Sequence, residues 1–337
     1  MKGLYARKSF DSQLQELTVR SLGPREVRLK VLACGVCGTD LHLLRQAEDY
    51  SPLGHEVCGQ VLACGSEVKR FQVKQQVVME DVALCGVCEA CKSGRSDLCR
   101  SGQDMQSAPG MAEELVVHES MLHDATGIPP LAAAMTEPLA VSIRCVETLN
   151  PRPGKPLAIF GMGAIGLYCA AYARLRGAGR IVMIARDPNS ARNRIAGEIA
   201  QAYGADDIVY TKEVDWQQRI LAQEPVDAAI VAAPPPLCVP ALDLVDYGGR
   251  VLACGITFGE DRQALLNIND MVFQKKSLLT SIAEPALDFP LSLQLIRTGR
   301  IDVQRIITHS LPLTQHERLK ELYGQDAPAV KTVMLSA

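Results

Sequence analysis

The chain has 337 residues, which is too long for a single small core and suits two domains. Hydrophobic residues make up 47% and charged residues 22%, the profile of an ordinary globular protein, and a formal net charge of −3 excludes a basic surface for nucleic acid or anionic lipid. The sequence contains no run of about 18 apolar residues and no apolar segment near its start, so we expect a cytoplasmic protein with no membrane span and no secretion signal.

The first part of the chain reads as β-structure. Over the first ~60 residues apolar and polar side chains alternate, with Gly and Pro between the runs, and Val27–Val31 is an example. Alternation of this kind is typical of strands that bury one face. We therefore expect a mostly β domain at the N-terminus.

Three short segments, 35–42, 54–56 and 136–139, carry side chains that are common in metal and catalytic sites. These side chains are Cys37, Thr39, His42, His55, Glu56 and Glu137. Singly each is a weak signal, because a lone Cys, His or Glu usually has a structural role. A threonine in a turn often bonds its own backbone, and a histidine is often an exposed ring. Their order along the chain, taken together with the other motifs, is more informative than any one of these residues.

Four of the twelve cysteines form a compact loop. They are Cys85, Cys88, Cys91 and Cys99. Short C-x2-C steps allow one loop to surround an ion, and a structural zinc prefers four soft ligands in a tetrahedron. Gly86 and Gly94 supply the tight turns that such a loop needs. The alternatives are unmetallated cysteines or an iron–sulfur cluster, and we favour a structural zinc with no chemical role.

From about residue 156 onward, short apolar strands alternate with helical patterns. The expected strands are Leu157–Phe160, Ile181–Ala185, Asp207–Tyr210, Ala228–Ala232, Arg250–Cys254 and Leu278–Ile282. Alternation of this kind predicts a parallel sheet wound on both faces. A last helix and a strand at 330–334 follow. The fold class is therefore α/β, with a discontinuous first domain (1–140 and 285–337) and a second domain at 141–284 inserted into it.

A glycine motif lies between the first of these strands and a helix that runs through Leu175. Its residues are Gly161, Gly163, Ala164, Ile165 and Gly166. Glycines at this spacing allow a tight turn, close approach of a pyrophosphate and packing of the helix on the strand, and the helix N-terminus then faces the phosphates. The context predicts dinucleotide binding.

The order of these motifs resembles that of the zinc-containing medium-chain dehydrogenase/reductase (alcohol dehydrogenase) superfamily. The resemblance covers nearly the whole chain, and it implies a GroES-like catalytic domain joined to a Rossmann domain. It also implies that Cys37, His55 and Glu137 bind a catalytic zinc whose fourth position is left for the substrate oxygen. Glu56 would lie beside the metal, as an exchange ligand or in a supporting position. The family also has a structural zinc, which would make two per subunit.

The branch of the family follows from Glu137. Other alcohol dehydrogenases carry Cys there, whereas the sorbitol and threonine dehydrogenases resemble this chain, and they favour secondary alcohols and polyols. The resemblance implies an alcohol dehydrogenase of class EC 1.1.1, in which zinc acts as a Lewis acid and the alcohol passes hydride to nicotinamide. Thr39 and His42 match the family's proton relay. The direction of turnover is open, and a ketone reductase is the alternative.

The choice of cofactor depends on the end of the second strand of the inserted domain. An acidic residue there would bind the ribose of NAD, but alignment with NAD-using relatives places Ala185 at that position, followed by Arg186 and Asp187. An adjacent guanidinium resembles the NADP-using members, where it pairs with the 2′-phosphate. A shifted turn would let Asp187 serve NAD instead. We expect NADP in preference to NAD.

Two other classes of function stay open. A catalytically silent zinc- and nucleotide-binding protein would lack ligand or relay residues, yet all are present. A thiol redox sensor would use the surplus cysteines, although these lie in apolar segments where Cys behaves as a small core residue. The surplus cysteines are Cys34, Cys58, Cys64, Cys145, Cys169, Cys238 and Cys254.

Loops are expected to form the substrate pocket, at Leu43–Leu53, Met105–Met111 and Thr257–Asp261. The first is polar, which favours a hydroxylated substrate: a polyol, a sugar-derived alcohol or an amino-alcohol. The resemblance also implies a homodimer or homotetramer, with contacts through Gly249–Ile256 and Leu278–Ile282.

Overall fold

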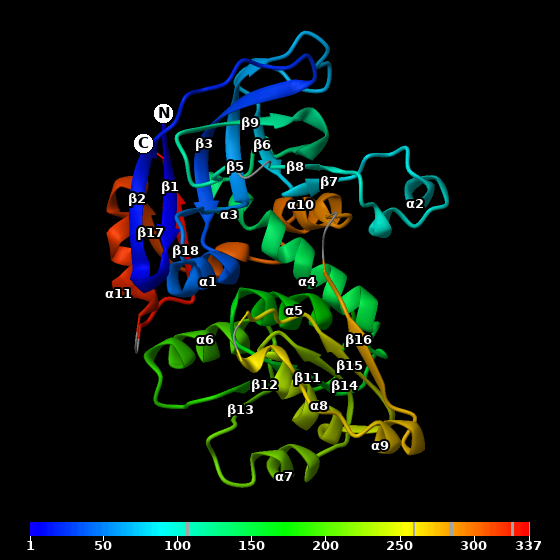
Figure 1. Cartoon of the computed structure of the whole chain (residues 1–337). Coiled ribbons are helices and arrows are strands. Elements are labelled where there is room, and N and C mark those ends of the chain that lie inside the picture. The colour runs from blue at the N-terminus through cyan, green and yellow to red at the C-terminus, as the bar shows by residue number, and fades with distance from the viewer. Residues whose placement is uncertain (106–107, 259, 283–285, 325–326, 337) are drawn as a thin grey trace. The chain divides into compact units, whose positions relative to one another are not determined.

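The computed structural model describes residues 1–105, 108–258, 260–282, 286–324 and 327–336 (Figure 1). The chain divides into two compact units. The first consists of Met1–Ala140, Glu284–Gln325 and Lys331–Ala337, and the second of Val141–Ala283 and Asp326–Val330. The first unit is thus discontinuous in sequence and is completed by the C-terminal part of the chain. That each unit folds as an independent domain stays a prediction.

The first unit is mainly β-structure. Its strands are β1 (Lys2–Arg7), β2 (Asp11–Glu16), β3 (Glu26–Gly35), β4 (Ser51–Pro52), β5 (Glu56–Cys64), β6 (Gln76–Met79), β7 (Val82–Ala83), β8 (Gln103–Asp104), β9 (Glu114–His118), β10 (Leu122–Asp124), β17 (Ile307–Pro312) and β18 (Lys331–Leu335). Its helices are α1 (Gly38–Gln46), α2 (Glu89–Lys92), α3 (Pro130–Ala134), α10 (Phe289–Arg297) and α11 (Leu319–Tyr323), and α4 (Thr136–Leu149) begins in it.

The main sheet of the first unit has the order β10-β6-β5-β3-β18-β17, with β9 also paired to β3. Strand β3 is its centre, because it pairs antiparallel with β5, β9 and β18. Alternate residues of β3 are buried, among them Val27, Leu29 and Val31, as the sequence alternation predicts. The C-terminal strand β18 therefore lies beside a strand from the first tenth of the chain.

The second unit contains the expected parallel sheet. Its strands are β11 (Leu157–Phe160), β12 (Ile181–Ala185), β13 (Asp207–Tyr210), β14 (Val226–Val231), β15 (Val245–Ala253) and β16 (Ser277–Thr280). Its helices are α5 (Ala164–Leu175), α6 (Ala191–Ala202), α7 (Trp216–Leu221), α8 (Cys238–Leu244) and α9 (Ile268–Phe273). All the pairings are parallel and the order is β13-β12-β11-β14-β15-β16.

That order reverses direction at β11, which makes the sheet a Rossmann sheet with a switch point beside β11 and β14. Right-handed crossovers then place α5 and α6 on one face and α8 on the other, an arrangement that can be followed in Figure 1. All four residues of β11 are buried, since helices cover both faces of the sheet. The fold class predicted from the sequence is confirmed.

The strand limits differ from the prediction where the pattern of apolar residues is incomplete. Strands β11, β12 and β13 have the predicted limits, whereas β14, β15 and β16 begin earlier than predicted. Strand β15 contains the polar and glycine stretch Asp246–Gly249, which reads as a turn in the sequence but continues the strand past a register shift. Strand β18 begins one residue later than predicted.

The remaining short helices are of the 3-10 type. They are η1 (Lys8–Phe10), η2 (Ser96–Leu98), η3 (Glu119–Met121), η4 (Pro235–Leu237), η5 (Glu260–Arg262), η6 (Val303–Ile306) and η7 (Leu313–Arg318). Across the described ranges, no helix has the length and apolar character required to cross a membrane.

Candidate active site

A cluster of possible metal ligands forms where β3 ends and β5 begins. The antiparallel register pairs Gly35 of β3 with Glu56 of β5. Cys37 therefore follows the end of one strand while His55 precedes the start of its neighbour, and the two meet at the same edge. The ligand atoms of Cys37, His55 and Glu56 all lie within 4.8 Å of one another. Residues far apart in sequence are thus brought together by strand pairing.

Asp40 connects the two segments that carry these ligands. It is 2% exposed, in the first turn of α1, and its two carboxylate oxygens accept hydrogen bonds from different backbone groups. The N–H of Cys37 donates to Oδ2 at 2.8 Å, and the N–H of Gly54 donates to Oδ1 at 2.8 Å. Asp40 therefore sets the position of Cys37 relative to His55. No role for Asp40 was predicted from the sequence.

Glu56 is almost fully buried, at 1% exposure, and forms an ion pair with Lys331 of β18. Lys331 Nζ donates to Glu56 Oε1 at 2.5 Å and to the Val36 carbonyl at 2.8 Å. The second oxygen, Oε2, is buried and has no hydrogen-bond partner. A Cβ on Gly35 would lie 1.8 Å from this oxygen, so only glycine fits there. Lys331 was also missed, because 275 residues separate it from Glu56.

Glu137 lies near this cluster, in the first turn of α4. Burial raises its pKa to about 8; Glu56 and Asp81 add to the rise, while His55 opposes it. Burial lowers the pKa of His55, but its hydrogen bond with Cys37 and the charges of Cys37, Asp40 and Glu137 outweigh burial and raise it well above the usual range. Among described residues, however, the group within 4.8 Å contains Glu56 rather than the expected Glu137.

The donor set fits a zinc ion. It offers a thiol, an imidazole and a carboxylate, which are ligand types that zinc takes. The carboxylate of Glu137 is close enough to His55 for its charge to raise the pKa of that residue. Among the described residues, Oε2 of Glu56 has no hydrogen-bond partner, and burial with the nearby carboxylates of Glu56 and Asp81 raises the pKa of Glu137, so a cation bound here would stabilise both carboxylates. This is the pattern expected of a metal site rather than of a neutral core.

A pocket of about 290 Å³ lies beside His55. Thr39, the first residue of the expected relay, lines it, and His42 lies one helical turn further along α1. Leu43, Pro52, Met105 and Ala108 come from two of the three loops expected to form a substrate pocket. Residues 106, 107 and 259 of the expected loops lie outside the described residues.

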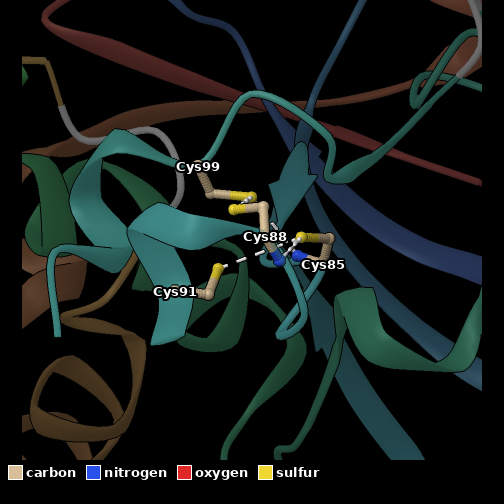
Figure 2. A group of neighbouring side chains, drawn as sticks. All are labelled: Cys85, Cys88, Cys91 and Cys99. Atoms are coloured by element: carbon tan, nitrogen blue, oxygen red, sulfur yellow. Dashed lines mark hydrogen bonds between the residues drawn. The ribbon is translucent and has the colours of Figure 1, made fainter. Parts of the chain in front are cut away.

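The four-cysteine loop forms a second cluster, which Figure 2 shows with the side chains turned toward one another. All four sulfur atoms lie within 4.8 Å, with 3.9 Å between Cys85 and Cys91 and 3.9 Å between Cys88 and Cys99. A tetrahedron of sulfurs around zinc has edges of about 3.8 Å, whereas a disulfide is about 2.05 Å long. The spacing fits a four-coordinate ion.

The ionisation of these thiols leads to the same conclusion. Backbone N–H groups of Val87 and Cys88 lower the pKa of Cys85 to about 6. Burial and the adjacent sulfurs raise the pKa of Cys91 to about 12. Four thiols this close cannot all become thiolates unless a cation offsets their charge.

The surplus cysteines are mostly inaccessible. Cys34, Cys58, Cys145, Cys169 and Cys238 are buried, and Cys64 and Cys254 are partly buried. Burial raises the pKa of Cys58 to about 12, which suppresses the reactive thiolate. A thiol sensor is therefore not favoured.

The glycine motif of the second unit forms the turn from β11 to α5. Gly161 has a positive φ of 103°, and a Cβ there would lie 2.5 Å from the Ala232 carbonyl oxygen. A Cβ on Gly166 would lie 1.9 Å from the carbonyl oxygen of Gly161. At Gly163, the N-cap of α5, the nearest atom to such a Cβ is 3.4 Å away, in the Arg192 guanidinium. The outer glycines allow the turn, and the middle one leaves space for a ligand at the helix N-terminus.

Basic side chains lie around the end of β12. Arg186 is exposed directly after the strand. Asp187, the alternative ribose ligand, is already engaged: it is paired with Lys212 Nζ and accepts from the Asn189 N–H at 2.9 Å. The sequence analysis missed Lys212 and Arg192, which lie on different segments of the second unit.

Comparison with known proteins agrees with this arrangement. The sequence model "Alcohol dehydrogenase GroES-like domain" matches residues 23–129, and "Zinc-binding dehydrogenase" matches residues 164–298. A sorbitol dehydrogenase of Bacillus subtilis (strain 168) is 29% identical over 95% of this chain and 93% of its own length. L-galactonate-5-dehydrogenase of Escherichia coli (strain K12) is 30% identical, over 90% and 88%. A solved zinc-binding dehydrogenase from Sinorhizobium meliloti 1021, bound to NADP, has a TM-score of 0.85 at 26% identity, covering 99% of this chain and 98% of that one.

Proposed function

Because the chain belongs to the zinc-containing medium-chain dehydrogenase/reductase family, in its sorbitol and threonine dehydrogenase-like branch, we propose that it interconverts a secondary alcohol and the corresponding ketone by hydride transfer to and from NADP. The protein is an alcohol-type oxidoreductase. The proposed substrate is a polyol, a sugar-derived alcohol or an amino-alcohol. The observation that carries the proposal is the cluster of Cys37, His55 and Glu56 beside a pocket.

Cys37, His55 and Glu56 would hold the catalytic zinc, with Glu137 close by to exchange with Glu56 or with the substrate oxygen. Zinc bound there would supply Lewis acidity, which lowers the pKa of an alcohol toward neutrality. Lys331 offsets part of the charge of Glu56, and Asp40 holds the two ligand segments in register. The four-cysteine loop would hold a second, structural zinc.

The chain itself must carry the alcohol's proton to solvent. Thr39 lines the pocket, so its hydroxyl can accept that proton at Oγ1 while donating its own. His42 follows on the same helix and can pass the proton on, because an imidazole can accept a proton at one ring nitrogen and release one from the other. The C–H bond of the alcohol would give up its hydrogen as hydride, with the electron pair, to a bound nicotinamide, and the alcohol carbon would become a carbonyl.

The proposed preference for NADP is supported by charge. Arg186 is exposed at the end of β12, Arg192 lies beside Gly163, and Lys212 occupies the carboxylate of Asp187. Two arginines and an acid neutralised by Lys212 suit a 2′-phosphate better than a bare ribose. We expect Arg186→Asp to shift the kcat/KM ratio of NADP to NAD by about tenfold or more toward NAD. An unchanged ratio would remove the basis for this preference.

A screen of polyols and secondary alcohols with NAD and NADP in parallel tests the activity, and the ketones with reduced cofactors test the reverse direction. Alcohol-dependent reduction of cofactor by protein that contains zinc is the expected result. Folded, zinc-loaded protein that turns over no alcohol or ketone would favour a silent binding protein.

The second unit presents a surface suited to another copy of the chain. Among the described residues, strand β16 lies at the edge of the sheet and pairs only with β15, which leaves one side of the strand for pairing with another chain. Large apolar side chains nearby are exposed: Ile256, Phe258, Leu265, Ile268, Val272, Phe273 and Ile282. An exposed apolar patch of this kind marks an association surface, and we propose a homodimer or homotetramer formed through it. Phe273→Glu should shift the mass measured by light scattering toward the monomer.

A further inference from the structure

The pocket beside His55 is acidic. Its acidic lining side chains are Asp40, Asp81 and Asp104, His55 is its basic side chain, and neither Lys nor Arg occurs among the described residues that line it. The three carboxylates are not equivalent. Both oxygens of Asp40 accept backbone hydrogen bonds, so Asp40 is fully committed to holding the ligand segments. Asp104 already takes part in another interaction.

Asp81 differs from both. Its Oδ1 is buried and has no hydrogen-bond partner among the residues that the structure describes. The preceding residue, Glu80, is engaged with the His123 ring at 2.7 Å, so the structure already satisfies one of these two adjacent carboxylates and leaves the other unsatisfied. Asp81 is also close enough to Glu137 to raise the pKa of that residue, so it lies near the metal cluster as well as in the pocket.

A carboxylate oxygen without a partner is costly, because it has lost water and gained no donor in return. A ligand that donates a hydrogen bond there recovers this free energy on binding. A ligand with a carboxylate or phosphate at the same place would meet the like charge of Asp81, which weakens its binding.

We propose that Asp81 is a specificity-determining residue that accepts a hydrogen bond from a hydroxyl or an ammonium group of the substrate and excludes substrates with an anionic end. The substrate class narrows to neutral polyols and amino-polyols, at the expense of sugar acids and sugar phosphates. The inference rests on the proposed alcohol dehydrogenase function.

Three six-carbon probes with the same hydroxyl pattern separate the possibilities: D-sorbitol (neutral), 1-amino-1-deoxy-D-sorbitol (cationic) and D-gluconate (anionic). The kcat/KM of each is measured for the wild type, Asp81→Asn, Asp81→Glu and Asp243→Asn. Asp243 is an exposed residue of α8, outside the pocket, so its variant has the same loss of charge without the same position. Thermal unfolding and zinc content are measured for each variant.

The wild type should use sorbitol or the amino-polyol and discriminate against gluconate. The sorbitol-to-gluconate ratio should fall by about tenfold or more in Asp81→Asn and persist in Asp81→Glu and Asp243→Asn. Faster turnover of the amino-polyol than of sorbitol would identify an ammonium as the donor to Asp81. Faster turnover of sorbitol would identify a hydroxyl.

A purely structural role of Asp81 would lower the rates with all three probes alike. A sorbitol-to-gluconate ratio in Asp81→Asn within twofold of the wild-type ratio would overturn the inference while the proposed activity stands. If the wild type oxidises other alcohols in the screen but none of these three probes, the inference about Asp81 fails and the proposed activity stands. If it oxidises no alcohol at all, the proposed function fails with it.

Discussion

The two candidate metal clusters of the first unit are built in opposite ways. The four-cysteine loop takes all its ligands from residues 85–99, and its sulfur atoms contact one another and nearby backbone N–H groups. The cluster around Cys37 takes its groups from the N-terminal end of α1, the start of β5, α4 and β18, and several of these are almost completely buried.

That difference separates a structural site from a reactive one. A loop with four soft ligands has no position left for a substrate, so it can only hold the chain in place. A cluster with three ligands beside a pocket has room for one more oxygen, and its surroundings must keep the ligands in position while that oxygen changes. Removing a ligand should therefore affect different properties at the two places.

The largest effect is expected from Cys37→Ser. Loss of the thiolate removes a zinc ligand, and with it several kcal/mol of transition-state stabilisation by the ion, so kcat/KM should fall about a thousandfold or more. The circular dichroism spectrum should be unchanged. Zinc content should fall by about one ion. Cys64→Ser, a change at a partly buried cysteine outside both clusters, is the control and should retain activity. Full activity in Cys37→Ser would refute the assignment of the catalytic site.

The next effect is on stability, from Lys331→Met. The side chain of Lys331 is buried against Glu56, and removing one partner of a buried pair leaves an uncompensated charge, which costs about 4 kcal/mol of unfolding free energy. Urea denaturation of the zinc-loaded protein measures this cost. Lys320→Met, at an exposed position in α11, should cost much less. Equal losses would mean that the pair does not hold the cluster.

Removing a ligand from the other cluster should weaken the fold rather than the chemistry. When the free zinc concentration is a few hundred times the Kd of the four-cysteine loop, zinc binding stabilises the fold by about 3 kcal/mol. Cys99→Ser should lose that stabilisation. Below its lowered unfolding temperature the variant should keep most of its kcat. A loss of kcat as large as that of Cys37→Ser, in folded Cys99→Ser, would contradict the distinction between the two clusters.

The smallest effect is expected at Asp40, which binds no metal itself. Asp40→Asn keeps the shape but loses charge and one acceptor, so the zinc affinity of the Cys37 cluster should fall about tenfold, as measured by chelator competition. The exposed Asp243→Asn should leave that affinity unchanged. An affinity within twofold of the wild type would show that the two backbone bonds do not position the ligands.

Local patterns predicted much of this architecture. Strands β11, β12 and β13 have the predicted limits because each is a short apolar run between clear breaks. Strand β15 was predicted to begin at Arg250, whereas in the structure it begins at Val245 and pairs with β14 on both sides of Asp246–Gly249. The parallel sheet, the glycine turn and the family all follow from the order of motifs along the chain.

The motifs that could bind a metal or a nucleotide were recognisable in the sequence, because spacing within a short segment is preserved in any fold that the segment adopts. The four-cysteine loop and the glycine turn are of this kind. Only the tertiary structure decided that Glu56 lies within ligand distance of Cys37 and His55, that Lys331 neutralises it, that Asp40 joins the ligand segments and that Asp81 faces the pocket unpaired. Those relations depend on strand register and on burial, which bring together residues separated by up to 275 positions.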